Sequence, residues 1–374
     1  MYSVSPILSY RLLGDADRNF YFYNQLKFVI IGIFAWAVVT NVSYERWRRL
    51  APYLMVVALM SLFALLIPGL RHTQNGATRW LNLGFITFQP AELLKLALVV
   101  YLASWLDRRA KEVSSFWDGV VPYTLMIGAV CFVIVVWQRD MGTMMVVALL
   151  SLGMYYVAGI RMSHLGMVMG AAAVASWLAI LSAPHRLDRL AAFMNPGQDA
   201  TGTGYHISQA LIAVGSGGVL GVGLGHSLAV YGYLPEASND SVFAVIAEEF
   251  GYVGSLALIG LFGFVIYRGL KIARTAPDNY SRLVATGITI WLIAQTAINI
   301  SAMLALLPLT GIPLPFISYG GTSLIMALVA VGILQNISKY TVMEVTDANS
   351  RQWGRHGRPH YANSSGRRRP QIAG

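Results

Sequence analysis

The chain has 374 residues, of which 56% are hydrophobic and only 12% charged; soluble domains carry about 25% charged residues, so this composition excludes a soluble globular protein. The formal net charge of +10 does not indicate nucleic-acid binding, because the basic residues gather in short segments between apolar runs and in the C-terminal tail. The single cysteine, Cys131, excludes an intramolecular disulfide.

Apolar runs recur along the chain at the length that crosses a bilayer, which is about 20 residues for a helix. We expect nine spans, at residues 26–42, 51–70, 88–106, 119–137, 140–158, 163–183, 241–267, 283–307 and 318–338. Basic residues cluster in alternate connections, and the positive-inside rule places those connections in the cytoplasm. The pattern predicts an all-α polytopic membrane domain over residues 1–340, with a cytoplasmic C-terminus and a basic, disordered tail over 341–374.

The N-terminus does not fit this topology. Nine spans and a cytoplasmic C-terminus would leave the N-terminus outside, although residues 1–6 precede no apolar run of their own. We therefore expect one further span, upstream of the first, to be missing from this sequence.

Two charged residues begin the third span. Glu92 and Lys95 are three residues apart and so share one helix face. They could form a structural ion pair that fixes helix docking, or they could line a cavity in which Lys95 meets an anionic substrate. We favour the second interpretation, because Arg79 lies close by in the preceding connection.

Asp140 lies in a tight turn, Gln138-Arg-Asp140, between two spans. Its carboxylate could cap the next helix through backbone N–H groups, or it could belong to a functional site. The residues alone give these two interpretations equal weight.

The connection from 184 to 240 is too long for an ordinary loop, and long loops are often functional. Its apolar stretch 207–214 precedes a glycine cluster, which predicts a re-entrant or interfacial helix packed closely on the bundle. A phosphate-binding loop is the alternative, but the glycine spacing matches neither standard phosphate fingerprint. Arg186 and Arg189 open the segment; such arginines are usually just solvated, yet beside a carboxylate they could hold a phosphate-bearing headgroup.

Asp240 stands where this segment becomes a span. Asn239, Asp240 or Ser241 could each be the helix N-cap, which is the structural interpretation of the aspartate. The functional interpretation places a carboxylate at the membrane–water interface, where it could act as a general base. Glu248 and Glu249 lie further along the helix, and we expect them to face the bundle interior or to pair with a cation, because lipid exposure is costly.

The last two spans are joined by a Pro- and Gly-rich hairpin, 308–322, that contains Ser318. No Asp, Glu, Lys or Arg occurs between Leu283 and Ser338. The backbone of the hairpin must be buried in protein, because unpaired backbone groups cannot face lipid.

Several stretches, in a fixed order, together resemble the SEDS family (shape, elongation, division and sporulation), which includes the division protein FtsW and the elongation protein RodA. They are Asn75–Trp80, Gln89–Lys95, Gly204–Gln209 with Ala213–Gly218, Tyr233–Ala237, Phe243–Glu249 and Leu314–Gly321. The resemblance covers nearly the whole chain and implies a ten-span helical bundle, of which nine spans are visible here.

The resemblance also implies an activity: polymerisation of lipid II into glycan strands by an inverting peptidoglycan glycosyltransferase. It aligns Asp240 with the family's essential aspartate, proposed to deprotonate the acceptor sugar while undecaprenyl pyrophosphate leaves. The further candidates for substrate binding are Arg79, Glu92, Lys95, Asp140, Arg186, Arg189, Gln209 and Ser318. A divalent cation, Mg²⁺ or Mn²⁺, is compatible with this chemistry although no ligand cluster in the sequence identifies one, and no organic cofactor is expected.

Two stretches depart from the family pattern. Ser238-Asn239 and Ser241 flank Asp240 where the family often has His-Thr and Phe, and Arg139 stands where proline is common.

Division and elongation proteins share these motifs. Tyr233–Ala237, Gly223–Ser227 and Ala247–Glu249 look closer to the division type, which favours an FtsW-like protein of the bacterial cytoplasmic membrane, located at the septum with its active site outside. Its partners would be a class B penicillin-binding protein and other division or elongation proteins. The alternatives are a RodA-like elongation polymerase, a lipid II flippase and a non-catalytic division scaffold.

Overall fold

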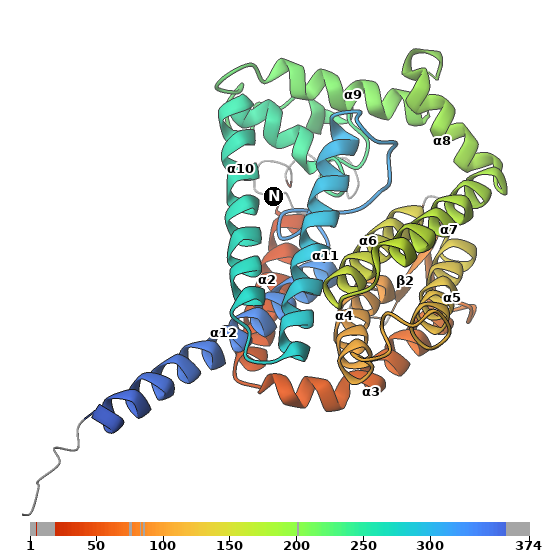
Figure 1. Cartoon of the computed structure of the whole chain (residues 1–374). Helices are drawn as coiled ribbons and strands as arrows, with labels where there is room; N and C mark the ends of the chain where they lie inside the picture. Colours follow the sequence, from red (N-terminus) through yellow and green to blue (C-terminus); the bar gives the residue numbers. More distant parts are fainter. Residues whose placement is uncertain are drawn as a thin grey trace, which may run out of the picture.

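The computed structural model describes Ser5 and residues 19–74, 77–82, 84, 87–199 and 202–356. Helices dominate these ranges (Figure 1). In chain order they are α2 (Phe20–Thr40), α3 (Tyr44–Ala64), α4 (Pro90–Arg108), η2 (Phe116–Val120), α5 (Val121–Trp137), α6 (Met141–Val157), α7 (Met162–Leu181), α8 (Pro184–Met194), η3 (Pro196–Gln198), α9 (Thr203–Ser216), η4 (Ala229–Tyr231), α10 (Val242–Arg274), α11 (Asn279–Met303) and α12 (Gly321–His356).

Each of the nine predicted spans coincides with a helix: α2 to α7 and α10 to α12. Within the described ranges, seven helices are long and apolar enough to cross a membrane. The other two predicted spans are α6, which is apolar but has 17 residues, and α4, which carries Glu92 and Lys95. The prediction of a polytopic helical membrane protein is confirmed.

Some predicted boundaries shift. Helix α3 begins at Tyr44, before the predicted start at 51, so Arg46, Arg48 and Arg49 lie in its first turns and not in a loop. Helix α12 continues to His356, past the predicted end of the membrane domain at 340. Residues 357–374 of the basic tail lie outside the described residues, as do 1–4 and 6–18, on which the expectation of a missing first span depends.

A small antiparallel sheet connects α3 to α4, and the sequence did not predict it. Its strands are β1 (Arg71–Gln74), β2 (Ala77–Asn82) and β3 (Thr87–Phe88), in the spatial order β1-β2-β3. Leu81 of β2 pairs with Arg71 on one side and with Phe88 on the other. Strands this short and polar give little hydrophobic periodicity. The sheet matters because β2 carries Arg79.

The core is centred on α4 and α11, whose side chains are mostly buried. Helix α11 packs against α4, α6 and α10, while α2 packs along α12. Helix α7 differs, because Val168 is its only buried residue. It contacts α6, α8 and η2 but leaves most of its surface outside the bundle.

The segment from 184 to 240 lies over one end of the bundle, with α8 and α9 running across it (Figure 1). The helix predicted at 207–214 forms α9, where Ile207, Ala210 and Ala213 are buried on one face. These residues pack with Val242 and Phe243 at the start of α10. The long connection is therefore a packed layer that brings α9 to the beginning of α10.

Helix α10 is not the continuous span that the sequence predicts. Gly251 has φ +65° and ψ −162°, which breaks the helix in two. The backbone N–H groups of Val222 and Gly223 donate to the carbonyls of Glu248 and Glu249 at 3.0 Å each. The broken turn of α10 is thus paired with the glycine-rich loop that follows α9.

The glycines of that loop permit this close approach. A Cβ on Gly217 would lie 2.0 Å from the carbonyl oxygen of Ala247, and one on Gly221 would lie 2.1 Å from that of Glu249. No side chain fits at either distance. The prediction that the cluster serves backbone packing and not phosphate binding agrees with this geometry.

Candidate functional site

Asp240 lies in the turn directly before α10. The N-cap residue of α10 is Ser241, and no side chain caps that end by a hydrogen bond. The Asp240 carbonyl accepts a 2.7 Å hydrogen bond from Nδ2 of Asn299, which also donates to the carbonyl of Ile312 at 2.7 Å. The structure therefore holds Asp240 by its backbone and leaves its carboxylate free of a capping role.

The Asp240 carboxylate is partly buried, and its Oδ1 is closed off from solvent without a hydrogen-bond partner. Burial, reinforced by the nearby Glu236 carboxylate, raises the pKa of Asp240 to about 7, against the opposing effect of Arg189 and Arg79. A carboxyl group with a pKa near neutrality is suited to accept a proton in catalysis.

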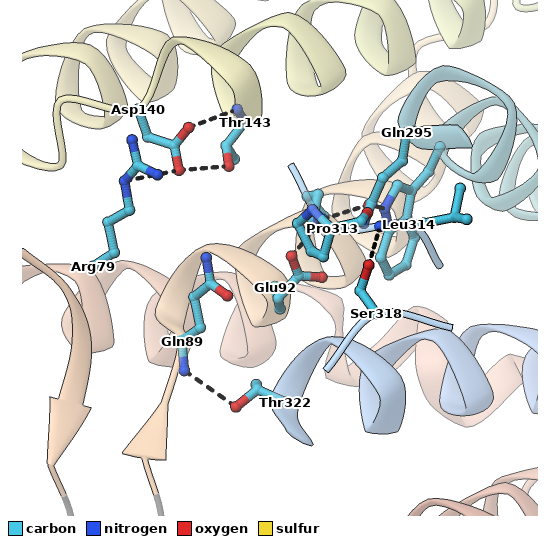
Figure 2. Close-up of polar contacts among 12 residues, drawn as sticks. Arg79, Gln89, Glu92, Asp140, Thr143, Gln295, Pro313, Leu314, Ser318 and Thr322 are labelled. Carbon is cyan, nitrogen blue, oxygen red and sulfur yellow. Dashed lines mark hydrogen bonds and ion pairs between the residues drawn. The ribbon is translucent and has the colours of Figure 1, made fainter. Parts of the chain in front are cut away.

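The side chain of Arg79, on strand β2, extends toward the Asp240 carboxylate. A Cβ added to Gly311 would lie 3.5 Å from Nη1 of Arg79 and 3.8 Å from Oδ2 of Asp240, so both charged groups border one small space. Nε of Arg79 lies 3.5 Å from Oδ2 of Asp140, and its Nη2 donates to the carbonyl of Arg139 at 3.2 Å. Figure 2 shows Arg79 directed toward Asp140 in the α5–α6 turn. This turn thus positions Arg79 beside Asp240.

Asp140 caps α6, as one of the two interpretations predicted, and it also pairs with Arg79. Its Oδ1 accepts the backbone N–H of Thr143 at 3.0 Å, which caps α6, and its Oδ2 accepts the Thr143 hydroxyl at 3.0 Å. The same oxygen pairs with Arg79. The preceding Arg139 has φ +53°, which proline cannot adopt, so this turn differs from one built on Gln-Pro-Asp.

The two arginines of α8 have different roles. Burial, with the nearby Arg79 charge, lowers the pKa of Arg189, against the opposing effect of Asp140 and Asp240. Arg186 is buried, and it donates to the carbonyls of Ala179 at 2.6 Å and Val135 at 2.8 Å, near the ends of α7 and α5. The structure places Arg189 at the site and makes Arg186 a cap for unpaired helix-end carbonyls, which corrects its expected role as a phosphate ligand.

His206 is a site residue that the sequence reasoning did not single out, although it lies within the stretch Gly204–Gln209. Its Nε2 lies 2.6 Å from Oγ of Ser241, and that hydroxyl donates to the carbonyl of Pro235 at 2.9 Å. Burial, with the nearby Arg189 charge, lowers the pKa of His206 to about 4, so a neutral imidazole supports the turn. Gln209 lies three residues on and is half-buried on the same helix.

Ser318 connects the hairpin after α11 to the Asp240 turn. Its hydroxyl accepts the Leu314 backbone N–H at 2.7 Å and donates to the carbonyl of Asn239 at 2.5 Å. The neighbouring Tyr319 N–H donates to the carbonyl of Ser238 at 2.8 Å. Ser318 is buried, so it orders the backbone beside Asp240 and does not present its hydroxyl to a ligand.

Glu92 and Lys95 form a buried pair and do not line an open cavity, which corrects the interpretation favoured from sequence. Each is 1% exposed. Nζ of Lys95 lies 2.7 Å from Oε1 of Glu92 and 2.7 Å from Oε1 of Gln295, and 5.1 Å from the centre of the Trp291 ring. Gln295 in turn donates to the carbonyl of Pro313 at 2.9 Å (Figure 2). The pair connects α4, α11 and the hairpin.

The two glutamates of α10 face the interior, as predicted, and their carboxylates accept hydrogen bonds from backbone N–H groups of the preceding loop. Glu248 accepts the Ser227 hydroxyl at 2.5 Å and the N–H groups of Leu228 and Ala229 at 3.0 and 3.2 Å. Glu249 accepts the N–H of Gly225 at 3.0 Å. They fix the loop between α9 and α10.

A groove of about 880 Å³ lies between α5, α6 and α7 and reaches the start of α8. Its walls are mainly apolar, and Arg139, His185 and Arg186 stand at one end. The Arg139 carbonyl accepts from Arg79, so this end of the groove adjoins the Asp240 site. The arrangement combines an apolar channel with basic groups and a carboxylate that can accept a proton.

Among the described residues, no three His, Cys, Asp or Glu side chains are close enough to hold a metal ion. Glu236 is a second carboxylate whose charge acts on Asp240 at this site. Mg²⁺ is often bound by only one or two carboxylates together with substrate phosphates. The residues present therefore fit a cation that arrives with a phosphorylated ligand better than a cation held by protein alone.

The family described as cell cycle protein, that of FtsW, RodA and SpoVE, matches residues 1–343. The stage V sporulation protein E of Bacillus subtilis is 40% identical over 87% of this chain and 88% of its own length. A probable peptidoglycan glycosyltransferase FtsW of Thioalkalivibrio is 39% identical over 90% of this chain and 84% of its own.

Solved structures agree with these sequences. A peptidoglycan synthase complex that coordinates polymerisation and crosslinking contains a chain with a TM-score of 0.75 and 28% identity, covering 90% of this chain and 96% of that one. The rod shape determining protein RodA of Thermus thermophilus gives a TM-score of 0.64 and 27% identity, over 90% of this chain and 93% of that one. The chain therefore belongs to the SEDS family of cell cycle proteins, that of FtsW, RodA and SpoVE.

Proposed function

We propose that this protein is a peptidoglycan glycosyltransferase that polymerises lipid II on the outer face of the bacterial cytoplasmic membrane. The observation that carries the proposal is the Asp240 carboxylate, which has a pKa of about 7 and no capping role, and which faces Arg79 across Gly311. Relatives named as probable peptidoglycan glycosyltransferases at 39% and 37% identity support the assignment.

Asp240 acts as the general base in this mechanism. Its carboxylate takes the proton from a hydroxyl of the acceptor sugar, and that oxygen bonds to the anomeric carbon of the donor sugar. The bond from that carbon to the pyrophosphate oxygen breaks, and the electron pair leaves with undecaprenyl pyrophosphate. A single displacement with one base inverts the anomeric carbon and needs no covalent enzyme intermediate.

Arg79 and Arg189 are the groups placed to meet the pyrophosphate. Their positive charges lie beside Asp240, and guanidinium groups bind phosphate oxygens through paired hydrogen bonds. Asp140 orients Arg79. His206 and Ser318 order the backbone on either side of Asp240.

The groove between α5, α6 and α7 is the proposed site for the polyprenyl chain of lipid II. Its apolar walls match a hydrocarbon chain, and its basic end adjoins Arg79. A lipid bound there would present its pyrophosphate to the arginines while its tail stays in the membrane.

A divalent cation, Mg²⁺ or Mn²⁺, would be held by Glu236 and the pyrophosphate oxygens of the substrate, which leaves the Asp240 carboxylate to accept the proton. When bound it would neutralise the charge of the leaving pyrophosphate.

We further propose a role in septal cell-wall synthesis with a class B penicillin-binding protein as partner. The relatives named FtsW support the division role, and the matched chain of a complex that coordinates polymerisation with crosslinking supports such a partner. A sporulation role is the second candidate, because the stage V sporulation protein E is 40% identical to this chain. The C-terminus lies in the cytoplasm in this arrangement.

The test is lipid II polymerisation by the purified protein with a divalent cation and its penicillin-binding partner, whose transpeptidase serine is blocked. Wild type should make glycan strands, and Asp240→Asn should make none. Asp188→Asn, which removes an exposed carboxylate from α8, is the matched control and should keep activity.

Equal activity in wild type and a well-folded Asp240→Asn would remove Asp240 from the mechanism. An inactive wild type that moves lipid II between leaflets of a vesicle would replace polymerisation by transport. An inactive wild type that transports nothing but still recruits its partner would make the protein a scaffold.

A further inference from the structure

A second cavity lies at a different place in the bundle, where α3, α4 and α11 meet. It encloses about 340 Å³ and is lined by Tyr44, Glu45, Arg48, Arg49, Arg108 and Asp278. These residues come from the start of α3, the end of α4 and the N-cap of α11. The proposed mechanism uses none of them.

Two of the charged groups in this cavity are already engaged. Arg48 forms a 2.6 Å ion pair with Asp107 and lies 5.6 Å from the centre of the Tyr280 ring. Asp278 caps α11 by accepting the N–H and the hydroxyl of Ser281. These two residues form part of the cavity wall. The other charged residues that line it are Glu45, Arg49 and Arg108.

The remaining basic groups have spare donors. Arg108 gives one hydrogen bond, to the Ser104 hydroxyl at 3.0 Å, which leaves most of its guanidinium unused. Within the described part of the chain, no hydrogen bond or ion pair engages the side chain of Arg49. Two guanidinium groups that border one cavity are suited to a phosphate, whose oxygens they bind in pairs.

The outer surface beside Arg49 is apolar. Tyr53, Val56 and Met60 follow Arg49 at helical spacing, and they are 70%, 54% and 64% exposed. Residues at these spacings share one face of a helix. A hydrocarbon chain attached to a phosphate at Arg49 would therefore lie along this stripe, which favours a lipid over a soluble anion.

The acidic residue Glu45 also lines the cavity, one helical turn before Arg49. Its carboxylate would repel a headgroup that carries only negative charge but would attract an ammonium group. We propose that this cavity binds the phosphoethanolamine headgroup of a membrane phospholipid. Arg49 and Arg108 hold the phosphate, Glu45 holds the ammonium group, and one acyl chain follows the stripe of Tyr53, Val56 and Met60.

The test counts lipids that stay bound to the full-length protein in native mass spectrometry after exchange into phosphatidylethanolamine, phosphatidylglycerol or phosphatidylcholine. Wild type should retain phosphatidylethanolamine best. Arg49→Gln and Arg108→Gln should each weaken retention about fivefold, the usual effect of one basic residue on binding to lipid headgroups. Glu45→Gln should remove the advantage of phosphatidylethanolamine over phosphatidylglycerol.

Arg46→Gln is the matched control, because Arg46 lies in the same turns of α3 but does not line the cavity. It should retain lipid as wild type does, and equal losses in Arg46→Gln and Arg49→Gln would overturn the proposal in favour of a diffuse basic surface. Equal retention of the three lipids by wild type would overturn it as well. Thermal unfolding in lipid-free detergent verifies that Arg49→Gln, an exposed substitution, is folded.

Soluble probes separate the lipid from free phosphate. Neither inorganic phosphate nor glycerophosphoethanolamine should displace the bound phospholipid at equal concentration, because each lacks the acyl chain that contacts α3. Displacement by either probe at that concentration would assign the cavity to a soluble phosphate and overturn the lipid assignment.

Discussion

At the scale of single residues, the site depends on which charges are satisfied and which are not. Asp140, Glu248 and Glu249 all accept backbone N–H groups, whereas Oδ1 of Asp240 is buried without a partner. Burying a carboxylate oxygen without a hydrogen-bond partner favours the protonated form of the group. Asp240 is therefore the acid whose proton can be exchanged near neutral pH.

The first prediction concerns the pH dependence of polymerisation. The rate should rise with pH and level off above about 7, because the general base is the deprotonated form of Asp240. His206 does not contribute to this rise, because its pKa of about 4 keeps the imidazole neutral at the pH values near 7 where the rate changes. Initial rates of polymerisation measured from acidic to basic pH, with partner and cation saturating, test this prediction. If the rate is half-maximal near the ordinary pKa of aspartate, the burial of Asp240 described above is contradicted.

The second prediction concerns the stability of Asp240→Asn. The pKa of Asp240 is 3.8 in the unfolded reference and about 7 when folded, so the folded protein binds more protons between these values. The contribution of Asp240 to stability is therefore favourable below that window and is lost as pH rises through it. Asn carries no charge to bury, and we expect the variant to be more stable than wild type by up to about 4 kcal/mol above neutrality, because each pKa unit of the shift corresponds to about 1.36 kcal/mol.

Thermal unfolding of both proteins across the same pH range provides the measurement. The difference should shrink as the pH falls toward the unfolded pKa of Asp240. A variant less stable than wild type at every pH would show that the charged carboxylate has a stabilising partner.

At the scale of elements, the glycine-rich loop and the broken turn of α10 form one unit. Gly221 has φ +84° and a Cβ there would meet the Glu249 carbonyl, whereas Gly225 has φ +80° and open space around it. At both positions the positive φ disfavours any residue with a side chain, but only at Gly221 would the side chain also clash with a neighbouring backbone atom. Comparing substitutions at the two glycines therefore separates the cost of the backbone conformation from the cost of the clash.

The third prediction follows from this pair. Gly225→Ala should lower the free energy of unfolding by about 1 kcal/mol, the usual cost of a left-handed alanine. Gly221→Ala should cost at least about 1–3 kcal/mol more, since the loop must move away from α10. Thermal unfolding in one detergent compares them directly. Equal losses would mean that the loop does not pack against α10 as described.

The order and approximate positions of the helices could be predicted from the sequence, but the contacts between distant segments could be predicted only in part. Apolar runs of spanning length locate helices, because the bilayer imposes both length and composition. The break at Gly251 gave no such signal, since it depends on hydrogen bonds to residues 218–223, which are distant in sequence.

The same limit applies to the candidate site. Asp240, Arg79 and Asp140 lie close together, and the sequence places each of them at or between the ends of predicted spans. Lys95 was assigned to substrate because Arg79 lies nearby in the sequence, and Arg186 because an arginine beside a carboxylate can hold a phosphate. Their partners, Gln295 on α11 and the carbonyls of α5 and α7, are set by tertiary packing that the sequence does not display.

At the scale of the whole molecule, the protein divides into a tightly packed part and an open part. Buried contacts join α4, α11 and α12, and the Glu92–Lys95 pair ties the hairpin at residues 308–322 to them. Helix α7 has a single buried residue and forms one wall of the groove. The packed part fixes the Asp240 turn, while the open part contains the apolar groove proposed for the polyprenyl chain.

The fourth prediction tests whether the groove in the open part binds the polyprenyl chain of the substrate. Ala175 of α7 lines the groove, while Ala173 on the same helix is exposed and does not line it. Ala175→Trp should fill part of the groove and raise KM for lipid II with a full polyprenyl chain about tenfold, the effect of losing about 1.4 kcal/mol of binding. Ala173→Trp, the matched control, should leave KM unchanged.

A lipid II analogue with a short chain makes the experiment specific to the groove. Such a substrate does not reach Ala175, so the KM of Ala175→Trp should equal that of wild type when the short analogue is used. A rise in KM for both substrates would instead indicate damage to the Asp240 site. No rise for either would place the polyprenyl chain elsewhere on the bundle, and the apolar walls of α5, α6 and α7 would then face ordinary membrane lipid.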